Sequence, residues 1–558
     1  AWLKKHRTGV PHSCRCFSKL LSMPTDPGSQ WVVLKFGGTS VATAERWNVI
    51  IDEVKRVRSA GERPCVVVSA VSQVTNRLNK CIEEALNDMA PSQESSSYSW
   101  VSCTHQRLAE ELGVAGDEEG MKPLRELLEE LKRLLEGIRL TREASARLCA
   151  RVSAFGELMS SQLGLLAIRK AGCDCVRLDA RQLLRSTETT AQQDADRFLN
   201  ANVNPTSNRA LLDSELKKAG GEEAAVITQG FIASTPKGET CLLGRGGSDT
   251  SGALLAALMP AVRLEIWTDV HGLFTSDPRH VNQTRLIRVS SYRVAQELAS
   301  MGAKVLHPRC LVPAQWSNIP VEVHNTQDPS GPFTRIFEQS VKNPDELPSK
   351  ARRLMKKEKI LAVTQRSGQV LINITNLNMW GEAGFLQRCF APFGELDVSV
   401  DLVATSQYAV SLTLDHIPGG MNGDVFARLM DRLGSLGQVT KHAPCAVVSI
   451  VGEHLRNALP DLGKALSETL AELTDCNVHL MTQSSEDLNL SWVVDEDQAK
   501  MLVQGLHNRL FAESARGAYS DEMADVFGHT WEELRQAAEM LPKRHMSFDG
   551  LDFKAKRA

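Results

Sequence analysis

The stretch L-G-R-G-G-S-D-T at residues 243–250 pairs with a second glycine-rich stretch, K-F-G-G-T-S at residues 35–40. Each follows a short apolar run, and each carries one cation, Arg245 or Lys35. Adjacent glycines let a backbone approach a ligand and turn its N–H groups toward it, and the N-terminus of a following helix favours anions. One such loop is also typical of an ordinary turn. Two of them predict a site for more than one anionic group.

Around these loops, apolar runs alternate with helical patterns from residue 31 to about residue 336. Continuous apolar strands, rather than alternating ones, indicate an α/β fold with a mostly parallel sheet sandwiched by helices. Residues 104–170 should be almost wholly helical, because leucines recur there at helical spacing. Strands are expected at 31–36, 65–70, 175–178, 225–232, 264–268 and 321–325, and helices at 43–59 and 251–258.

The composition excludes several classes of protein. A net charge of −3 and an aromatic content of 5% do not favour nucleic-acid binding. No apolar run is long enough to span a membrane. The sequence has 13 cysteines, and no two of them are spaced as in a C-x-x-C motif. We therefore expect reduced thiols in a cytoplasmic protein, and neither a disulfide framework nor a zinc site.

The rest of the chain divides by composition. Residues 1–30 are expected to be an upstream extension of the reading frame or a disordered arm, with a natural start at Met23. Residues 341–360 are basic and contain proline, which is typical of a linker, and residues 516–558 form a polar tail that could lead to a further domain. Two segments between them share a strand–helix–strand pattern. Their expected strands are 361–364, 370–375, 398–401 and 409–414, then 446–451, 478–481 and 488–494.

Both glycine-rich stretches resemble signatures of aspartate kinase, within the amino-acid kinase superfamily. The resemblance runs from about residue 31 to about residue 515. It implies a kinase domain at 31–340 and two α+β ACT modules at 361–440 and 441–515, as in the lysine-inhibited type. ACT modules are βαββαβ units that bind amino acids, and here the second would be interleaved with the first. Other matching motifs are V-V-V-S-A at 66–70, S-A-F-G-E at 153–157, W-T-D-V at 267–270 and G-A-K-V-L-H-P at 302–308.

The two anion-binding loops suit phosphoryl transfer, and the chain has no Walker A sequence. If the acceptor is the side-chain carboxylate of aspartate, it is already ionised at neutral pH and needs no general base. The resemblance implies that ATP and L-aspartate give ADP and 4-phospho-L-aspartate, the first step toward lysine, threonine and methionine. It makes Lys35 the residue that binds the transferring phosphoryl group, with Asp249 orienting Lys35.

Recognition of L-aspartate requires a carboxylate for the α-ammonium and a guanidinium for the α-carboxylate. The resemblance assigns these tasks to Glu157 and Arg245, with Ser69, Thr75 and Ser248 nearby. Magnesium should be held mainly by nucleotide oxygens, so we expect no metal site made of protein ligands alone. The implied nucleotide-binding residues are Gly37, Gly38, Thr39, Ser40, Gly246, Gly247, Thr268, Asp269, Phe274, Asp277, Arg279 and Lys304.

The ACT modules imply feedback control by an amino acid and a homodimer or higher homo-oligomer. Lysine is the expected effector, but Gln407 stands where the family often has glutamate, which leaves threonine open. The ACT pair could instead serve only for dimerisation. Three other readings remain: glutamate kinase, a catalytically silent amino-acid sensor, and the kinase half of a bifunctional enzyme. The implied effector residues are Met379, Phe385, Val400, Asp401 and Ser406.

Overall fold

The computed structural model describes residues 31–93, 95–187, 194–204, 209–221, 223–303, 305–337, 359–473, 476–511 and 526–540. The expected N-terminal extension lies outside these residues, as does the expected linker apart from its last two positions. The chain divides into two compact units. Unit 1 contains residues 1–273 and 289–355, and unit 2 contains residues 274–288 and 356–558.

Unit 1 is built on an eight-stranded sheet with the order β3-β4-β2-β1-β7-β10-β11-β9. Pairing is parallel throughout, except between β10 and β11. The central strand β1 is buried at all six positions, as expected for a strand covered on both faces. The strands are β1 (Trp31–Phe36), β2 (Arg63–Val68), β3 (Cys175–Arg177), β4 (Ala225–Gln229), β7 (Arg263–Thr268), β9 (Val289–Ser291), β10 (Val321–Asn325) and β11 (Thr334–Phe337).

The predicted α/β class with a mostly parallel sheet is confirmed. One predicted strand, 225–232, is interrupted because Phe231 adopts a left-handed backbone conformation with φ 65°. The chain therefore turns after β4, and a separate hairpin follows, formed by β5 (Ile232–Ser234) and β6 (Thr240–Leu242).

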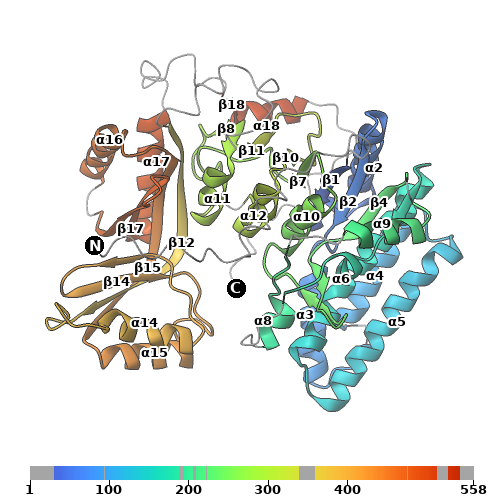
Figure 1. Cartoon of the computed structure of the whole chain (residues 1–558), viewed down its shortest axis with the longest axis horizontal. Helices are drawn as coiled ribbons and strands as arrows, with labels where there is room; N and C mark the ends of the chain where they lie inside the picture. Colours follow the sequence, from blue (N-terminus) through green and yellow to red (C-terminus); the bar gives the residue numbers. More distant parts are fainter. Residues whose placement is uncertain are drawn as a thin grey trace, which may run out of the picture. The chain divides into compact units, whose positions relative to one another are not determined.

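Helices cover the sheet of unit 1, and the predicted helical region at 104–170 is confirmed. The longest of them, α6, is buried along most of its length, and α3, α4 and α5 lie together at one end of the unit (Figure 1). The helices are α2 (Ala44–Ser59), α3 (Val74–Leu86), α4 (Ser97–Glu111), α5 (Glu118–Thr141), α6 (Ala146–Lys170), α7 (Ala180–Leu183), α8 (Asp194–Leu199), α9 (Arg209–Lys218), α10 (Gly247–Leu258), α11 (Tyr292–Ser300) and α12 (Pro308–Trp316), with a 3-10 turn η1 at Gly38–Val41.

Unit 2 contains a six-stranded antiparallel sheet with the order β13-β14-β12-β15-β17-β16. Two long strands, β12 (Lys359–Thr375) and β15 (Gln438–Glu453), run through both halves, so the two modules share one sheet. Helices α14 and α15 lie at one end and α16 and α17 at the other (Figure 1). The remaining elements are α14 (Phe385–Glu395), β13 (Val403–Thr405), β14 (Ala409–Leu414), α15 (Asp424–Gly434), α16 (Leu459–Glu472), β16 (Val478–Gln483), β17 (Asn489–Asp495) and α17 (Glu496–Phe511).

Two predictions about the first module were wrong. The expected strands 361–364 and 370–375 are a single strand, β12, whose pairing with β15 shifts in register around Gln369. The strand expected at 398–401 is not formed, and β13 begins only at Val403. Val398 is instead buried in the apolar core of this module, so its apolar character reflects core packing.

Residues 274–288, which the sequence places inside the kinase domain, pack with unit 2. The backbone N–H of Val363 in β12 donates to the carbonyl of Thr275 at 2.8 Å, and the Thr275 hydroxyl is 2.9 Å from Nε2 of His507 in α17. Val281 lies in the same apolar core as α16 and α17. The segment also contains β8 (Arg285–Ile287).

The tail expected to be polar and featureless contains two elements, β18 (Phe527–Thr530) and α18 (Trp531–Met540). Strand β18 pairs with β8, and Leu534 of α18 packs on Phe274 and Leu286. Sequence analysis missed this segment because its strand is only four residues long and pairs with β8, which lies far away in the sequence.

Candidate active site

The predicted catalytic residues lie where the parallel strands of unit 1 end. Lys35 is the next-to-last residue of β1, whose neighbours β2 and β7 run parallel to it on either side. In open α/β sheets, ligands bind outside the carboxyl ends of the strands. The loops that follow β1, β2 and β7 are therefore the expected place for a site.

Lys35 and Asp249 form an ion pair between Nζ and Oδ1. Their side chains are only 10% and 16% exposed, so water screens this pair poorly. Asp249 reaches Lys35 because α10 packs closely on β1: a Cβ on Gly252 would be 3.2 Å from Cβ of Lys35. The structure thus joins the two glycine-rich stretches through the charged residue pair that the sequence singled out.

Both glycine-rich loops are shaped by glycines at positions where a side chain would not fit. A Cβ on Gly38 would be 2.7 Å from the carbonyl oxygen of Ala70, and Gly246 has φ +69° with His307 directly against it. No side chain caps the N-terminus of α10 or of α3. Uncapped helix N-termini have N–H groups available for an anion.

The Glu157 carboxyl group is deeply buried against Ala70 of the loop after β2, at 3% exposure. Its Oε2 has no hydrogen-bond partner within the described part of the chain. Burial raises the pKa of Glu157 to about 8, although hydrogen bonds from the backbone N–H groups of Ala70 and of Glu157 itself favour the ionised form. A buried carboxyl with an unpaired oxygen fits a cationic ligand group, because such a group would satisfy both charge and hydrogen bond.

Three further predicted substrate residues lie on adjoining loops. The Ser69 hydroxyl donates to the carbonyl of Phe36 at 3.1 Å, which ties the loop after β2 to the end of β1. Thr75 is the second residue of α3. Ser248 is the second residue of α10 and lies against Gly230. The fourth, Arg245, is exposed, and its role in binding L-aspartate stays a prediction.

The predicted nucleotide residues are divided between the two units. Within unit 1, the Ser40 hydroxyl is 2.9 Å from that of Thr326, which donates at 2.7 Å to the carbonyl of Thr268 at the end of β7. Asp269 follows, with Oδ1 3.2 Å from the Thr268 hydroxyl. Phe274, Asp277 and Arg279 belong to unit 2, where Asp277 and Arg279 form an ion pair. Lys304 lies outside the described residues.

His307 is a residue that sequence analysis did not single out, although it is part of the quoted motif G-A-K-V-L-H-P. It caps α12, where its Nδ1 accepts from the backbone N–H of Arg309 at 3.3 Å. Burial, followed by the charge of Arg309, lowers the pKa of the His307 ring, while Asp249 acts in the opposite direction. A neutral ring packed against Gly246 would therefore help to fix the shape of the second glycine-rich loop.

The predicted effector residues belong to the first module of unit 2. Phe385 is buried in its apolar core, and Met379 and Val400 pack against that core. Asp401 forms an ion pair with Arg366 of β12. An effector ammonium group at Asp401 would therefore have to share the carboxylate with Arg366 or displace it.

The last effector candidate, Ser406, is exposed just after β13. Its hydroxyl accepts from the backbone N–H of Ala409 at 3.1 Å. This contact holds the turn that leads into β14, so the serine has a local structural role whether or not it touches an effector.

Comparison with known proteins agrees with this geometry. Residues 30–325 match the model of the amino acid kinase family. The lysine-sensitive aspartokinase 3 of Escherichia coli is 34% identical over 490 residues, which cover 87% of this chain and 100% of that protein. The chain belongs to the aspartokinase family. The family predicted from the sequence is thereby confirmed.

Two solved structures of an aspartokinase resemble this one along most of the chain. The E. coli aspartokinase III in complex with aspartate and ADP (R-state) has a TM-score of 0.70 and 32% identity, covering 86% of this chain and 100% of that one. The same enzyme with lysine and aspartate (T-state) has a TM-score of 0.66 and 31% identity, covering 87% and 100%. In the described part of the present aspartokinase-family chain, no helix has the length and apolar character needed to cross a bilayer.

Proposed function

We propose that this chain transfers the γ-phosphoryl group of ATP to the side-chain carboxylate of L-aspartate, giving ADP and 4-phospho-L-aspartate. The observation that carries this proposal is the buried Lys35–Asp249 pair at the end of β1, on the strand next to the one whose following loop contacts the buried carboxyl of Glu157. A solved relative at 32% identity binds aspartate and ADP. The product would supply the synthesis of lysine, threonine and methionine.

The reaction needs charge compensation more than acid–base catalysis. An oxygen of the aspartate carboxylate attacks the γ-phosphorus, and the bond from that phosphorus to the bridging oxygen of ADP breaks. Both reactants are anions, so a cation must offset their repulsion as they approach to about 3 Å. Lys35 supplies that charge, and Asp249 orients its ammonium group in a site with little water.

The substrate would be held by its α-substituents. The Glu157 carboxyl would accept from the α-ammonium, which would also stabilise its ionised form. Arg245 would pair with the α-carboxylate. Together they would leave the side-chain carboxylate as the only acidic group free to react.

The loops that carry the predicted nucleotide residues fit a phosphate chain. Gly37, Gly38, Gly246 and Gly247 keep side chains away from both loops, and the N-terminus of α10, which no side chain caps, leaves N–H groups available for an anion. Magnesium, held mainly by nucleotide oxygens, would neutralise phosphate charge when it is bound with ATP.

The direct test is an assay of ATP consumption in which hydroxylamine traps the acyl phosphate as a hydroxamate. Hydroxamate that requires L-aspartate would support the proposed reaction. Hydroxamate formed equally well with L-glutamate would favour a glutamate kinase. A folded protein that binds an amino acid but forms no hydroxamate would favour the silent sensor.

Lysine is the proposed feedback effector, acting at the first module of unit 2. The relative in its T-state binds lysine and aspartate. Inhibition requires that lysine bind the inactive arrangement more tightly than the active one. The Arg366–Asp401 pair offers a physical basis, because an effector ammonium and the Arg366 guanidinium would compete for one carboxylate.

Replacing Asp401 by asparagine should raise the lysine concentration for half-inhibition at least about tenfold, because a charge-assisted hydrogen bond is lost. Activity without lysine should stay close to wild type. The variant keeps the size of the side chain and its contact with Thr413. Asp431→Asn, an exposed change on α15 of the same module, is the matched control. If lysine inhibits Asp401→Asn as strongly as it inhibits the wild type, the effector site lies elsewhere. If threonine inhibits the enzyme and lysine does not, threonine is the effector.

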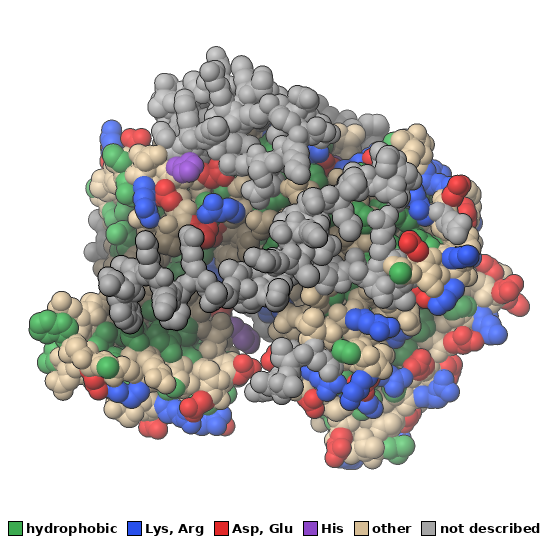
Figure 2. All heavy atoms as spheres, in the orientation of Figure 1, with side chains coloured by type: hydrophobic (Ala, Val, Ile, Leu, Met, Phe, Trp, Pro, Cys, Tyr) green, Lys and Arg blue, Asp and Glu red, His purple; other side chains and the backbone are tan. Residues whose placement is uncertain are grey.

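We also propose that the chain self-associates through the first module of unit 2. Leu377, Trp380 and Tyr408 are 83%, 77% and 54% exposed. Apolar side chains gather at the tip of the lobe that carries β14, α14 and α15 (lower left in Figure 2). Large exposed apolar side chains grouped on one module are typical of an interface.

Replacing Trp380 by serine should shift the protein toward a smaller species in sedimentation velocity at low micromolar concentration. The expected cause is the loss of a large aromatic contact from the interface. Trp316→Ser, at a tryptophan 60% exposed in unit 1, is the matched control and should sediment as wild type. If both variants keep the wild-type mass, the exposed apolar residues of this module are not the interface.

The proposed compartment is the cytoplasm. Buried free thiols such as those of Cys65, Cys310 and Cys445 are typical of proteins kept in a reducing environment. Burial raises the pKa of the Cys65 and Cys310 thiols, so both remain protonated and unreactive at neutral pH.

A further inference from the structure

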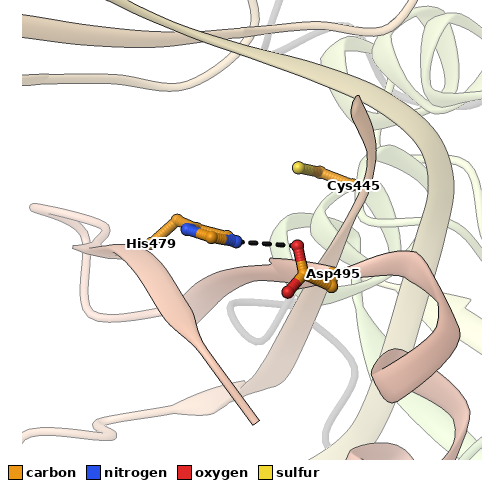
Figure 3. A group of neighbouring side chains, drawn as sticks. All are labelled: Cys445, His479 and Asp495. Carbon is orange, nitrogen blue, oxygen red and sulfur yellow. Dashed lines mark hydrogen bonds and ion pairs between the residues drawn. The ribbon is translucent and has the colours of Figure 1, made fainter. Parts of the chain in front are cut away.

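Three side chains with metal-binding atoms meet in the second module of unit 2, and none of them is a residue to which the proposed reaction or effector site assigns a role. They are Cys445 of β15, His479 of β16 and Asp495 of β17 (Figure 3). The Cys445 Sγ, a ring nitrogen of His479 and a carboxylate oxygen of Asp495 all lie within 4.8 Å of one another. The cysteine thiol lies above the His479–Asp495 pair, and the three strands are neighbours in the sheet.

The sheet itself brings these residues together. Cys445 and Asp495 are directly opposite in the antiparallel pairing of β15 with β17, so their side chains lie on the same face. His479 is located at a register shift, between the pairs Val478–Val494 and Leu480–Val493. Such an irregularity re-aims a side chain, and here it directs the imidazole toward Asp495.

The imidazole of His479 is held in place from two directions. Its Nε2 is 2.8 Å from Oδ1 of Asp495, and its ring stacks on that of His442 with centroids 4.9 Å apart. The Cys445 thiol donates to the backbone carbonyl of His442, with 3.4 Å between the sulfur and the oxygen. The group is therefore pre-positioned, which reduces the conformational entropy that a ligand would have to overcome.

The donor set matches one class of metal ion. A thiolate, an imidazole and a carboxylate are the ligands of zinc, whereas magnesium and calcium prefer oxygen alone. In a tetrahedral zinc site, ligand atoms lie about 3.3 to 3.8 Å apart, so side-chain rotations alone could close the observed spacing. The thiolate and the carboxylate would also balance the charge of a divalent cation.

A nucleophilic cysteine is the main alternative, since cysteine, histidine and aspartate also form catalytic triads. Cys445 is fully buried, so a substrate could not reach its sulfur. Burial and the nearby Asp495 raise the pKa of the thiol, whereas a nucleophilic cysteine needs a lowered one. Metal binding avoids both difficulties, because the ion is small and displaces the thiol proton itself.

We propose that Cys445, His479 and Asp495 bind a zinc-class divalent ion that fastens β15, β17 and β16 together, with water as the fourth ligand. The thiol proton is released to solvent on binding. The residues come from three separate strands, so the absence of C-x-x-C in the sequence does not bear on this site. The proposal is independent of the kinase reaction.

The test uses the full-length protein, stripped of metal with a chelator and then titrated with Zn²⁺ alone in a calorimeter. One equivalent should bind, and Zn²⁺ should raise the melting temperature. Cys445→Ser and His479→Gln should each weaken binding at least about tenfold. Co²⁺ in place of Zn²⁺ should give a thiolate-to-cobalt charge-transfer band that Cys445→Ser abolishes.

Cys389→Ser is the matched control, because Cys389 is a buried thiol in the core of the other module. It should bind Zn²⁺ as wild type does. His479→Gln changes a partly exposed residue, so it is expected to fold even if Cys445→Ser does not. Absence of Zn²⁺ binding by the wild type, wild-type affinity in His479→Gln, or a cobalt spectrum without the thiolate band would each overturn the proposal.

Discussion

Replacing Lys35 by alanine is expected to lower kcat by about 10³-fold or more, because no other cation in the first glycine-rich stretch can offset the repulsion between two anionic reactants. The buried position strengthens this expectation, since Lys35 acts in a region from which water is largely excluded. The loss should appear in kcat, measured as aspartate-dependent hydroxamate, more than in KM for either substrate. Such a split is typical of an interaction made mainly in the transition state.

The variant removes the partner of a mostly buried carboxylate, so its folding has to be checked separately. Lys35→Ala combined with Asp249→Asn removes both charges and should fold at least as well as Lys35→Ala, while remaining inactive. Lys217→Ala, at an exposed lysine of α9, is the control for general effects of losing a lysine. If the Lys35→Ala protein is folded and has the wild-type kcat, Lys35 does not bind the transferring phosphoryl group.

Replacing Glu157 by glutamine is expected to raise KM for L-aspartate about 100-fold and to leave KM for ATP nearly unchanged. The variant keeps the shape of the side chain but loses the charge that would pair with the α-ammonium group, in a buried site where such a pair is worth most. Initial rates at saturating ATP measure the effect. Glu110→Gln on α4, an exposed glutamate in the same unit, should behave as wild type.

The same residue predicts a pH dependence. With a pKa of about 8 in the protein without substrate, Glu157 is mostly neutral below that pH. The value of kcat/KM for L-aspartate should therefore rise as pH increases toward 8, and Glu157→Gln should lose this rise. A wild-type profile that is flat from about pH 6 to about pH 8 would contradict the role of Glu157.

Stability should show the opposite trend. The pKa of Glu157 is raised on folding from its ordinary value of 4.5, so the folded state binds more protons than the unfolded state between that value and about 8. This contribution to stability is complete below pH 4.5 and is lost as pH rises through about 8. Glu157→Gln should therefore gain stability relative to wild type as pH increases across this range.

Local patterns were enough to predict the strands at the centre of unit 1. Strand β1 begins and ends at the predicted residues, because its mostly apolar run, broken only by Lys35, is bounded by a glycine pair. The Lys35–Asp249 contact was predicted through the resemblance to aspartate kinase, which rests on two motifs that are each recognisable from consecutive residues. Features of this kind depend on a few consecutive residues, and sequence contains them directly.

Other features depend on contacts between distant residues, and the sequence did not indicate them. The pairing of Asp401 with Arg366 joins the segment before β13 to strand β12, and nothing in either local pattern specifies it. The group of Cys445, His479 and Asp495 exists only through strand register and one irregularity. His307 was overlooked because its role depends on packing against Gly246, which no spacing reveals.

The grouping of residues 274–288 with unit 2 has a consequence for protein engineering. A chimera that exchanged residues 356–558 for those of a relative would leave Thr275 without His507, and Val281 without the core that buries it. It would also remove β18 from β8. Domain swaps and truncations in this family should therefore carry this short internal segment along with the C-terminal half, even though the two are separated in the gene.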